Sequence, residues 1–265
     1  MTLKGKTALV TGASSGMGAC FATLLAARGA DLVITARRED RLKALAAEIT
    51  QKHGVAVTVV PLDISLPDAP GKLFERTEGA GKPVEVLVNN AGFANLGAFL
   101  DTSYERSAQL LTVNMLALTE LTWLFGRAMR DRGSGFILNM ASFSAFTPVP
   151  NMATYSASKV YVRNFSEALA MELEGSGVKV CTICPGIVNT DFYEVASRTA
   201  GGYIKPSGGD TPDTIAAIGL DALFAGKRLS LPVVKDHVHA FFIRLLPRGF
   251  VMKMAGKEMG GREKK

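Results

Sequence analysis

Short apolar runs rich in β-branched residues alternate along the chain with longer stretches whose apolar positions recur at helical spacing. The short runs predict strands at residues 7–10, 32–35, 55–61, 84–88, 135–140, 178–183 and 230–234. The longer stretches predict helices at residues 16–28, 40–52, 103–131, 153–174 and 212–225. Several strands are almost wholly apolar, as expected for parallel strands covered on both faces. The alternation therefore predicts an α/β fold, a doubly wound parallel sheet of the Rossmann type in a single domain.

Two segments fall outside this alternation. Residues 189–209 mix Gly, Ser, Thr and Pro with aromatic residues, which fits an active-site lid and equally a surface loop with a short helix. Residues 237–265 interleave apolar and basic residues at roughly helical spacing, interrupted by Pro247. We therefore expect a domain over residues 1–236 and an amphipathic C-terminal extension. Since amphipathic helices usually face a core, packing on the domain or on a neighbouring subunit is favoured over contact with an anionic membrane surface.

Composition and charge limit the class of protein. A length of 265 residues suits one α/β domain, and 48% hydrophobic and 20% charged residues are ordinary for a globular protein. The net charge of +6 arises after residue 226, where ten basic residues face three acidic ones. The nearly neutral body argues against a nucleic-acid partner.

Cysteine use and the N-terminal sequence bear on location. Three cysteines are too few for a disulfide framework and fit a reducing compartment, so we expect a cytoplasmic protein. Cys181 and Cys184 fall in a strand-like run that points them to opposite faces, and the histidines lack zinc-site spacing, so no metal is expected. We expect no signal peptide and, without an uninterrupted apolar run of about 18 residues, no membrane span.

The first predicted strand runs into a glycine-rich turn that a helix follows. Small residues there let backbone N–H groups approach a pyrophosphate, and the helix N-terminus adds partial positive charge. The spacing is G-x-x-x-G-x-G rather than the more common G-x-G-x-x-G. The turn predicts a dinucleotide phosphate site made of Gly12, Ser14, Ser15, Gly16, Met17 and Gly18.

The end of the second predicted strand bears on the choice between NAD and NADP. NAD-specific sites place an acidic residue there to bind the ribose 2′-hydroxyl, whereas this chain has Ala36. Arg37 and Arg38 follow at once and can pair with a 2′-phosphate. Solvated surface arginines would give the same sequence, but their coincidence with the missing acid favours NADP(H).

Three further motifs follow in order: Asn89-Asn90-Ala91-Gly92, Tyr155-Ser156-Ala157-Ser158-Lys159 and Pro185-Gly186. With the glycine turn, they resemble the short-chain dehydrogenase/reductase family over residues 3–234. The resemblance implies a seven-stranded parallel sheet, a nicotinamide cofactor and a homotetramer or homodimer. It also implies cofactor contacts from Asp63, Ile64, Asn90, Ala91, Gly92, Tyr155, Lys159, Pro185, Gly186, Val188 and Thr190.

The same resemblance places a catalytic tetrad at Asn114, Ser142, Tyr155 and Lys159. Tyr155 and Lys159 are four residues apart on a predicted helix, so they share one face. A free phenol has a pKa of about 10, and a neighbouring ammonium should favour the phenolate and so suit Tyr155 to acid/base work. Ser142 ends a strand where its hydroxyl can hold a substrate oxygen, and Asn114 can break its helix and hold a water for Lys159. A helix pair, a cap and a buried amide are the alternatives for single residues, but their joint occurrence favours catalysis.

Aromatic and apolar residues near these motifs predict a largely apolar substrate with one carbonyl or hydroxyl, such as a ketone, a 3-oxoacyl compound or a steroid. Substrate contacts are expected from Ser142, Phe143, Met152, Tyr155 and Phe192, with Phe93, Phe146 and Tyr193 as further pocket residues. The chain is thus predicted to be an NADP(H)-dependent oxidoreductase that acts mainly as a reductase. A non-catalytic NADP(H) sensor and an isomerase or dehydratase on the same scaffold are the alternatives.

Overall fold

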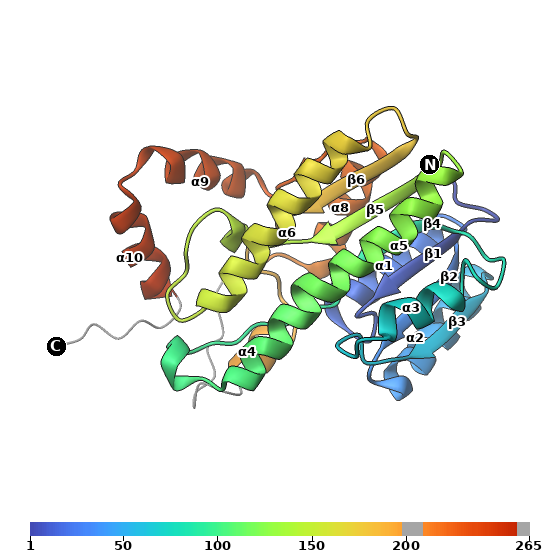
Figure 1. Cartoon of the computed structure of the whole chain (residues 1–265), viewed down its shortest axis with the longest axis horizontal. Coiled ribbons are helices and arrows are strands. Elements are labelled where there is room, and N and C mark those ends of the chain that lie inside the picture. Colours follow the sequence, from blue (N-terminus) through green and yellow to red (C-terminus); the bar gives the residue numbers. More distant parts are fainter. Residues whose placement is uncertain (198–208, 259–265) are drawn as a thin grey trace.

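Within residues 1–197 and 209–258, which this computed structural model describes, seven strands form one sheet in the order β3-β2-β1-β4-β5-β6-β7 (Figure 1). The strands are β1 (Thr7–Thr11), β2 (Asp31–Ala36), β3 (Val57–Pro61), β4 (Val84–Asn89), β5 (Gly135–Met140), β6 (Val178–Ile183) and β7 (Leu229–Ser230). Each neighbouring pair is parallel. The strand order reverses between β1 and β4. The predicted doubly wound parallel sheet is confirmed.

Helices cover both faces of this sheet. In the described part of the chain they are α1 (Gly16–Ala27), α2 (Glu39–His53), α3 (Ala69–Glu75), α4 (Tyr104–Leu111), α5 (Leu118–Asp131), α6 (Ala153–Glu172), α7 (Phe192–Ser197), α8 (Pro212–Phe224), α9 (Val234–Leu245) and α10 (Arg248–Glu258). The short segments η1 (Phe99–Asp101) and η3 (Phe143–Ala145) are 3₁₀ turns, and η2 (Thr112–Ala117) is a π-helix. The predicted helices are confirmed to within two residues at their ends, α7 is a short helix in the segment 189–209 for which one was considered, and α3 was not predicted.

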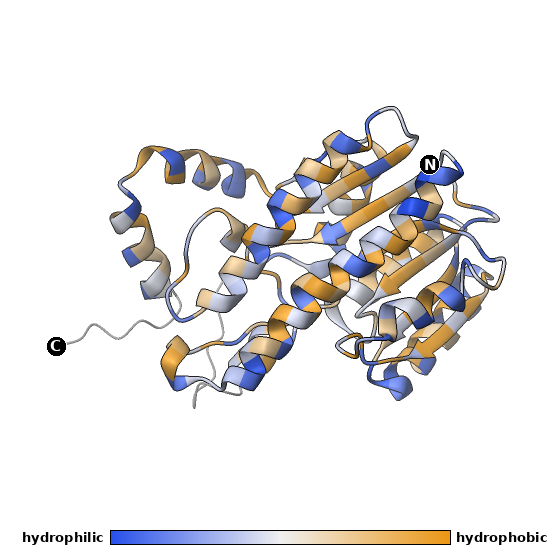
Figure 2. Cartoon of the chain, in the orientation of Figure 1, coloured by the Kyte–Doolittle hydropathy of each residue, from blue (hydrophilic) through white to orange (hydrophobic). Residues whose placement is uncertain are grey.

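Alternate side chains of each strand enter two separate cores. Val10 of β1 and Ile34 of β2 pack with residues of α1, α2 and α8, whereas Leu9 and Val33 pack with residues of α3 and α5 on the opposite face. Figure 2 accordingly shows hydrophobic strands between the helical layers. Burial on both faces explains why the strand sequences lack an apolar–polar alternation.

The last strand is shorter than the sequence predicted. The expected span was 230–234, but β7 contains only Leu229 and Ser230, and α9 already begins at Val234. Pro232 has no N–H group to donate to a neighbouring strand, so pairing cannot continue through it.

The predicted helix over 103–131 is one continuous helical run with a π-helical insertion at its centre. Asn114 lies in η2 and is 1% exposed, which agrees with the expected local break of the helix. By length and composition, the run Tyr104–Asp131 is the one helix in the described residues that could cross a membrane, a point that the search for uninterrupted apolar residues missed. Phe125 and Met129 of this run are fully buried in a core beside the sheet, so its length and composition are weak support for a membrane span.

The C-terminal extension forms two helices that project beside the carboxyl end of the sheet (Figure 1). Ala240 of α9 and Val251 of α10 are buried, and Gly256 approaches Pro150 so closely that a Cβ there would lie 3.2 Å from Pro150 Cγ. Most other side chains of α9 and α10 are exposed. The last residues of the extension, 259–265, and residues 198–208 of the expected lid segment lie outside the described residues.

Candidate active site

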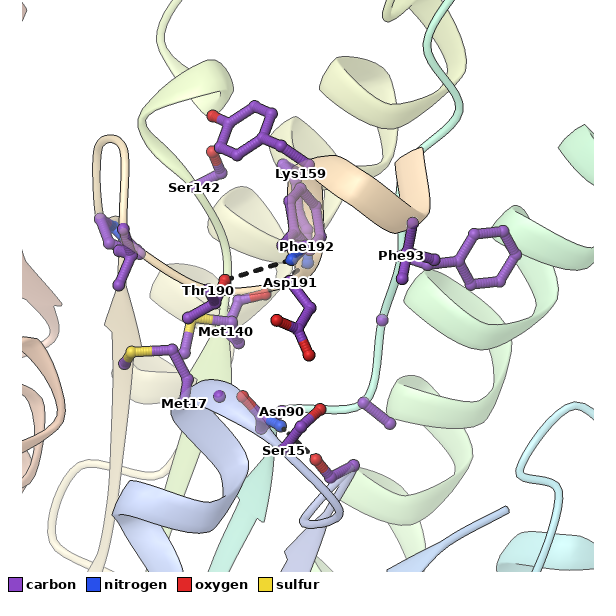
Figure 3. Close-up of a pocket in the computed structure, with 18 of the residues that line it drawn as sticks. Ser15, Met17, Asn90, Phe93, Met140, Ser142, Lys159, Thr190, Asp191 and Phe192 are labelled. Carbon is purple, nitrogen blue, oxygen red and sulfur yellow. Dashed lines mark hydrogen bonds between the residues drawn. The ribbon is translucent and has the colours of Figure 1, made fainter. Parts of the chain in front are cut away.

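The carboxyl ends of β1, β4, β5 and β6 border one cavity. The reversal of strand order between β1 and β4 is where open α/β sheets bind ligands. Figure 3 shows Ser15, Met17 and Asn90 at one end of this cavity and Ser142 and Lys159 at the other. Motifs far apart in the sequence meet in its lining: Gly12, Ser15, Gly16, Met17, Asn90, Ala91, Gly92, Ser142, Tyr155, Lys159, Pro185, Gly186, Val188, Thr190 and Phe192.

The side chain of Asn90 holds the glycine turn in place through hydrogen bonds. Asn90 Nδ2 donates hydrogen bonds to Thr11 O at 2.9 Å and to Gly12 O at 3.3 Å. Gly12 has a φ of +68°, and a Cβ on Gly18 would collide with Gly12 O. The turn therefore needs glycine at both positions. Asn90, expected as a cofactor contact, lines the cavity but uses its amide to hold the turn.

The helix that follows the turn presents its N-terminus to the cavity. Ser15 is the N-cap residue of α1, yet its side chain makes no capping hydrogen bond and instead accepts one from Arg38 Nη2 at 2.7 Å. The first N–H groups of α1 are thereby left for another acceptor. Such a helix N-terminus suits an anion.

A second hollow adjoins the turn at the end of β2. It is lined by the predicted residues Ser14, Ala36, Arg37, Arg38, Asp63 and Ile64. Arg38 Nη2 also donates to Ser14 Oγ at 2.9 Å, and burial together with the neighbouring Arg41 lowers the pKa of Arg38. Asp63 Oδ1 accepts from Ser65 N at 2.9 Å, which fixes its carboxylate at the far wall of the hollow. The hollow combines two arginines with a β2 end that carries no carboxylate.

The tetrad residues gather at the other end of the main cavity. Ser142 follows β5 and is the N-cap of η3, and Tyr155 and Lys159 lie one turn apart on α6. Tyr155 is 7% exposed and hydrogen-bonded to Ser142. Lys159 Nζ donates to Met140 O at 2.8 Å and lies 5.6 Å from the centre of the Tyr155 ring. The ammonium therefore lies near the Tyr155 ring and is hydrogen-bonded to the backbone at the end of β5.

Asn114 reaches this group from the π-helical segment. Its Oδ1 accepts from Phe93 N at 3.2 Å, and its Nδ2 donates to Phe93 O and to Ser158 Oγ, both at 3.1 Å. A Cβ on Gly92 would lie 3.0 Å from Asn114 Oδ1 and 3.6 Å from Lys159 Nζ, so both side chains border the same stretch of backbone. Asn114 thus joins the loop after β4 to the helix that carries Tyr155 and Lys159.

Burial dominates the ionisation of the two central groups. It raises the pKa of Tyr155 above the ordinary value of a phenol, and the hydrogen bond with Ser142 opposes this only in part. Burial also lowers the pKa of Lys159 to about 8. Burial thus acts against the phenolate that Lys159 is expected to favour, and the acid/base role of Tyr155 stays a prediction. At neutral pH the phenol keeps its proton.

We expect Lys159→Met to change how stability depends on pH. In the unfolded chain a lysine has a pKa of about 10.4, so between pH 8 and 10 the unfolded state binds a proton that the folded state has lost. The free energy of unfolding of the natural protein should therefore rise with pH in this range relative to the variant, by on the order of 3 kcal/mol in total. Denaturant unfolding of both proteins at several pH values measures the difference. The exposed Lys82→Met is the control, and parallel curves for Lys159→Met and the natural protein would contradict the lowered pKa.

A second, more apolar cavity opens on the far side of Tyr155. It shares Ser142, Tyr155, Gly186 and Tyr193 with the first cavity. Its wall is completed by α9 and α10, through Phe242, Ile243, Leu246, Val251, Met254 and Ala255. The space is about 1050 Å³ including its open mouth. Tyr155 and Ser142 therefore lie where the first, less apolar cavity, called the polar cavity below, meets the second, more apolar one, called the apolar cavity.

The predicted substrate contacts and pocket residues are divided between the two cavities. Phe143 and Met152 line the apolar cavity, Phe192 lines the polar one, and Tyr193 lines both. Phe93 contributes backbone, but its ring points away from the cavity and lies under the Arg106 guanidinium, 3.9 Å from the ring centre (Figure 3). Phe146 does not border either cavity in the described part of the chain, because its ring packs between Phe143 and Arg163. Phe93 is thus a lining residue of the first cavity, as predicted, whereas the prediction of Phe146 as a pocket residue is wrong for these two cavities.

Sequence reasoning missed the residues at the start of α9. Asp236 is 3% exposed, accepts a hydrogen bond from the backbone of Gly186, and has its pKa raised by burial. Lys235 pairs with Asp210, which bridges to Val188. The first turn of α9 thus holds the Pro185–Val188 loop in place through contacts at Gly186 and, by way of Asp210, at Val188. No local pattern at Lys235 and Asp236 marks a contact with a loop some fifty residues earlier in the chain.

Comparison with known proteins identifies the family. A sequence profile described as "short chain dehydrogenase" matches residues 6–200. The chain belongs to the short-chain dehydrogenase family. The family is the one that the motifs had suggested.

Members of this family with described activities align over most of the chain. A very-long-chain 3-oxoacyl-CoA reductase of Pyrenophora tritici-repentis is 36% identical over 206 residues, which are 74% of this chain but only 59% of that protein. The ketoacyl reductase HetN of Nostoc sp. is 34% identical over 81% of this chain and 74% of its own length. A short-chain dehydrogenase from Sphingobium yanoikuyae, solved in complex with NADPH, superposes with a TM-score of 0.81 at 30% identity over 98% of this chain and 97% of that one.

Proposed function

We propose that the chain is an NADP(H)-dependent reductase of apolar carbonyl compounds in which Tyr155 is the proton donor. The observation that carries the proposal is the position of Tyr155 and Ser142, which are shared by the polar and the apolar cavity. A cofactor bound along the polar cavity and a substrate bound in the apolar one would meet at these two hydroxyls. The same layout supports a catalyst better than a binding module.

The polar cavity fits a dinucleotide. Its floor is the glycine turn, which packs so closely against the loop after β4 that a Cβ on Gly12 would lie 2.9 Å from Ala91 Cα. The uncapped N-terminus of α1 suits the pyrophosphate, and Asp63 and Ile64 border the adenine end. Lys159, Pro185, Gly186, Val188 and Thr190 border the nicotinamide end. When bound, NADPH supplies the hydride.

The hollow at the end of β2 supports NADP(H) over NAD(H). Arg37 and Arg38 bring two positive charges, and the Ser14 hydroxyl is oriented by Arg38. Ala36 leaves out the carboxylate that would bind a free 2′-hydroxyl and repel a phosphate. The bound NADPH of the Sphingobium yanoikuyae protein is consistent with this choice.

The chain's own residues account for the proton that carbonyl reduction needs. The neutral Tyr155 phenol donates to the substrate oxygen, and Ser142 holds that oxygen by a second hydrogen bond. Burial lowers the pKa of Lys159 to about 8, so this side chain still carries its proton at neutral pH. Its positive charge near the Tyr155 ring can then stabilise the phenolate that forms. Asn114 keeps the helix of Tyr155 and Lys159 in register with the loop after β4. A phenol that keeps its proton at neutral pH favours the reductive direction.

The apolar cavity favours a bulky substrate without charge near the reacting carbon. Its walls are mostly aliphatic and aromatic, and α9 and α10 supply side chains such as Ile243 and Val251. Burial of such surface is the main source of affinity for apolar ligands. A ketone with two sizeable apolar groups or a 3-oxoacyl chain would fit this description.

The test is a panel of ketones of increasing apolar size assayed with NADPH and with NADH. We expect oxidation of NADPH, followed at 340 nm, with kcat/KM rising as the apolar groups grow. Binding of NADPH without turnover of any carbonyl would instead indicate a sensor. Conversion of a substrate without net oxidation of NADPH would indicate an isomerase or dehydratase.

We also propose that the chain is a homodimer or homotetramer. The long helix of α4, η2 and α5 exposes Leu116 and Trp123, at 64% and 56% of their surface, on its outward side. Exposed apolar side chains in a row on a core helix suit contact with another subunit.

A further inference from the structure

Helix α9 carries a row of apolar side chains that point away from the protein. We call Val234, Val238, Phe241 and Leu245 the α9 stripe; their exposed fractions are 77%, 47%, 60% and 66%. Their spacing of four, three and four residues puts them on one face of a helix. Each would be an ordinary surface residue alone, but a continuous row marks an interaction surface.

The other sides of α9 already have partners. Asp236 and Ala240 are buried against the body, and Phe242 and Ile243 line the apolar cavity. The α9 stripe is therefore the side of the helix that faces neither the body nor the apolar cavity. Figures 1 and 2 show α9 and α10 projecting from the body with hydrophobic residues along them.

Helix α10 continues this surface, and basic side chains flank it. Phe250 is 52% exposed, while Met254 is 53% exposed and also lines the apolar cavity, so the surface reaches the mouth of that cavity. Arg244, Arg248 and Lys253 are exposed beside it. Residues 237–265 contain seven basic and two acidic residues. Apolar residues flanked by arginine and lysine are typical of helices that lie in an anionic lipid interface.

We infer that the α9 stripe and its basic neighbours dock the protein on an anionic lipid bilayer. Phe241 and Leu245 enter the interface, and Arg244, Arg248 and Lys253 contact the lipid head groups. A second copy of the chain is a poorer occupant, because symmetric pairing through this surface would bring two strongly basic segments together. If the proposed function also holds, the apolar cavity opens toward the bilayer, and apolar substrate reaches Tyr155 without crossing water.

Vesicle sedimentation of the full chain, without cofactor or substrate, tests the docking. We expect binding to vesicles of phosphatidylcholine with about one-third phosphatidylglycerol to exceed binding to pure phosphatidylcholine at least about tenfold, and to fall as salt is raised. The double variant Phe241→Glu/Leu245→Glu should lose about tenfold or more in vesicle affinity. Leu66→Glu, which adds one negative charge at a side chain 48% exposed and far from α9 in the sequence, should bind as the natural protein does.

Two further measurements keep the result decisive. Both variants should keep the kcat of the natural protein for a water-soluble ketone, because Phe241, Leu245 and Leu66 are not among the residues that line the polar or the apolar cavity. Equal vesicle binding by the double variant and the natural protein would overturn the inference. So would light scattering in which the double variant dissociates an oligomer while vesicles bind none of the proteins, since the stripe would then contact a second copy. Failure of ketone reduction would leave docking untouched, so the two proposals are tested separately.

Discussion

Tyr155→Phe is expected to lower kcat for ketone reduction by roughly 10²–10⁴-fold, the usual contribution of a positioned proton donor. The change removes one oxygen from a side chain that is 7% exposed and otherwise packed with Leu110 and Met152, so the fold should be kept. The affinity for NADPH should change little, because the glycine turn and the hollow beside β2 are untouched. Steady-state kinetics and NADPH titration by fluorescence measure the two effects.

Tyr193→Phe is the matched control for this experiment. Tyr193 lines both cavities, as Tyr155 does, but it lies on α7 rather than beside Lys159. We expect its loss of hydroxyl to cost less than about tenfold in kcat, as for a hydrogen bond that does not act on the reacting atoms. Equal losses for the two variants would remove Tyr155 from its assigned role.

Ala36→Asp should turn the preference from NADPH to NADH. A carboxylate at the end of β2 would bind a ribose 2′-hydroxyl and repel a 2′-phosphate held by Arg37 and Arg38. Because a hydrogen bond to a charged group contributes about 1.5–3 kcal/mol, we expect kcat/KM with NADPH to fall by roughly 10- to 150-fold. The value with NADH should stay level or rise. The ratio of the two kcat/KM values is the measurement.

The control places the same charge elsewhere on the helix that follows. Gln51→Asp alters an exposed position near the end of α2 and leaves the hollow unchanged, so the ratio should stay as in the natural protein. In addition, Arg37→Asp should weaken NADPH more than NADH. If the arginine variant lost both cofactors equally, the hollow would not be the phosphate site.

The sheet and the motif residues could be predicted because they are fixed by local rules. Apolar runs of strand length gave β1 to β6, and the glycine spacing after β1 predicted a turn whose geometry requires Gly12 and Gly18. The short β7 differed because Pro232 ends strand pairing although the neighbouring residues are apolar. Patterns of this kind depend on neighbours in the chain, which a sequence displays directly.

The parts that could not be predicted depend on contacts between distant segments. The carboxylate of Asp236 meets Gly186 from a helix some fifty residues later in the chain, and no local pattern marks that meeting. The ring of Phe93, in the loop after β4, turns away to lie under the guanidinium of Arg106 on α4. The pKa of Tyr155 depends on how deeply the fold buries it, whereas the sequence displayed only its spacing from Lys159.

The most direct measurement follows deuterium from NADPH labelled at C4 of the nicotinamide into the product of an apolar ketone. We expect label from one of the two C4 positions to appear at the carbon of the new alcohol, and Tyr155→Phe to slow its appearance by the same factor as kcat. A product that carries no deuterium, or one that forms at the natural rate without the Tyr155 hydroxyl, would contradict the proposed reductase.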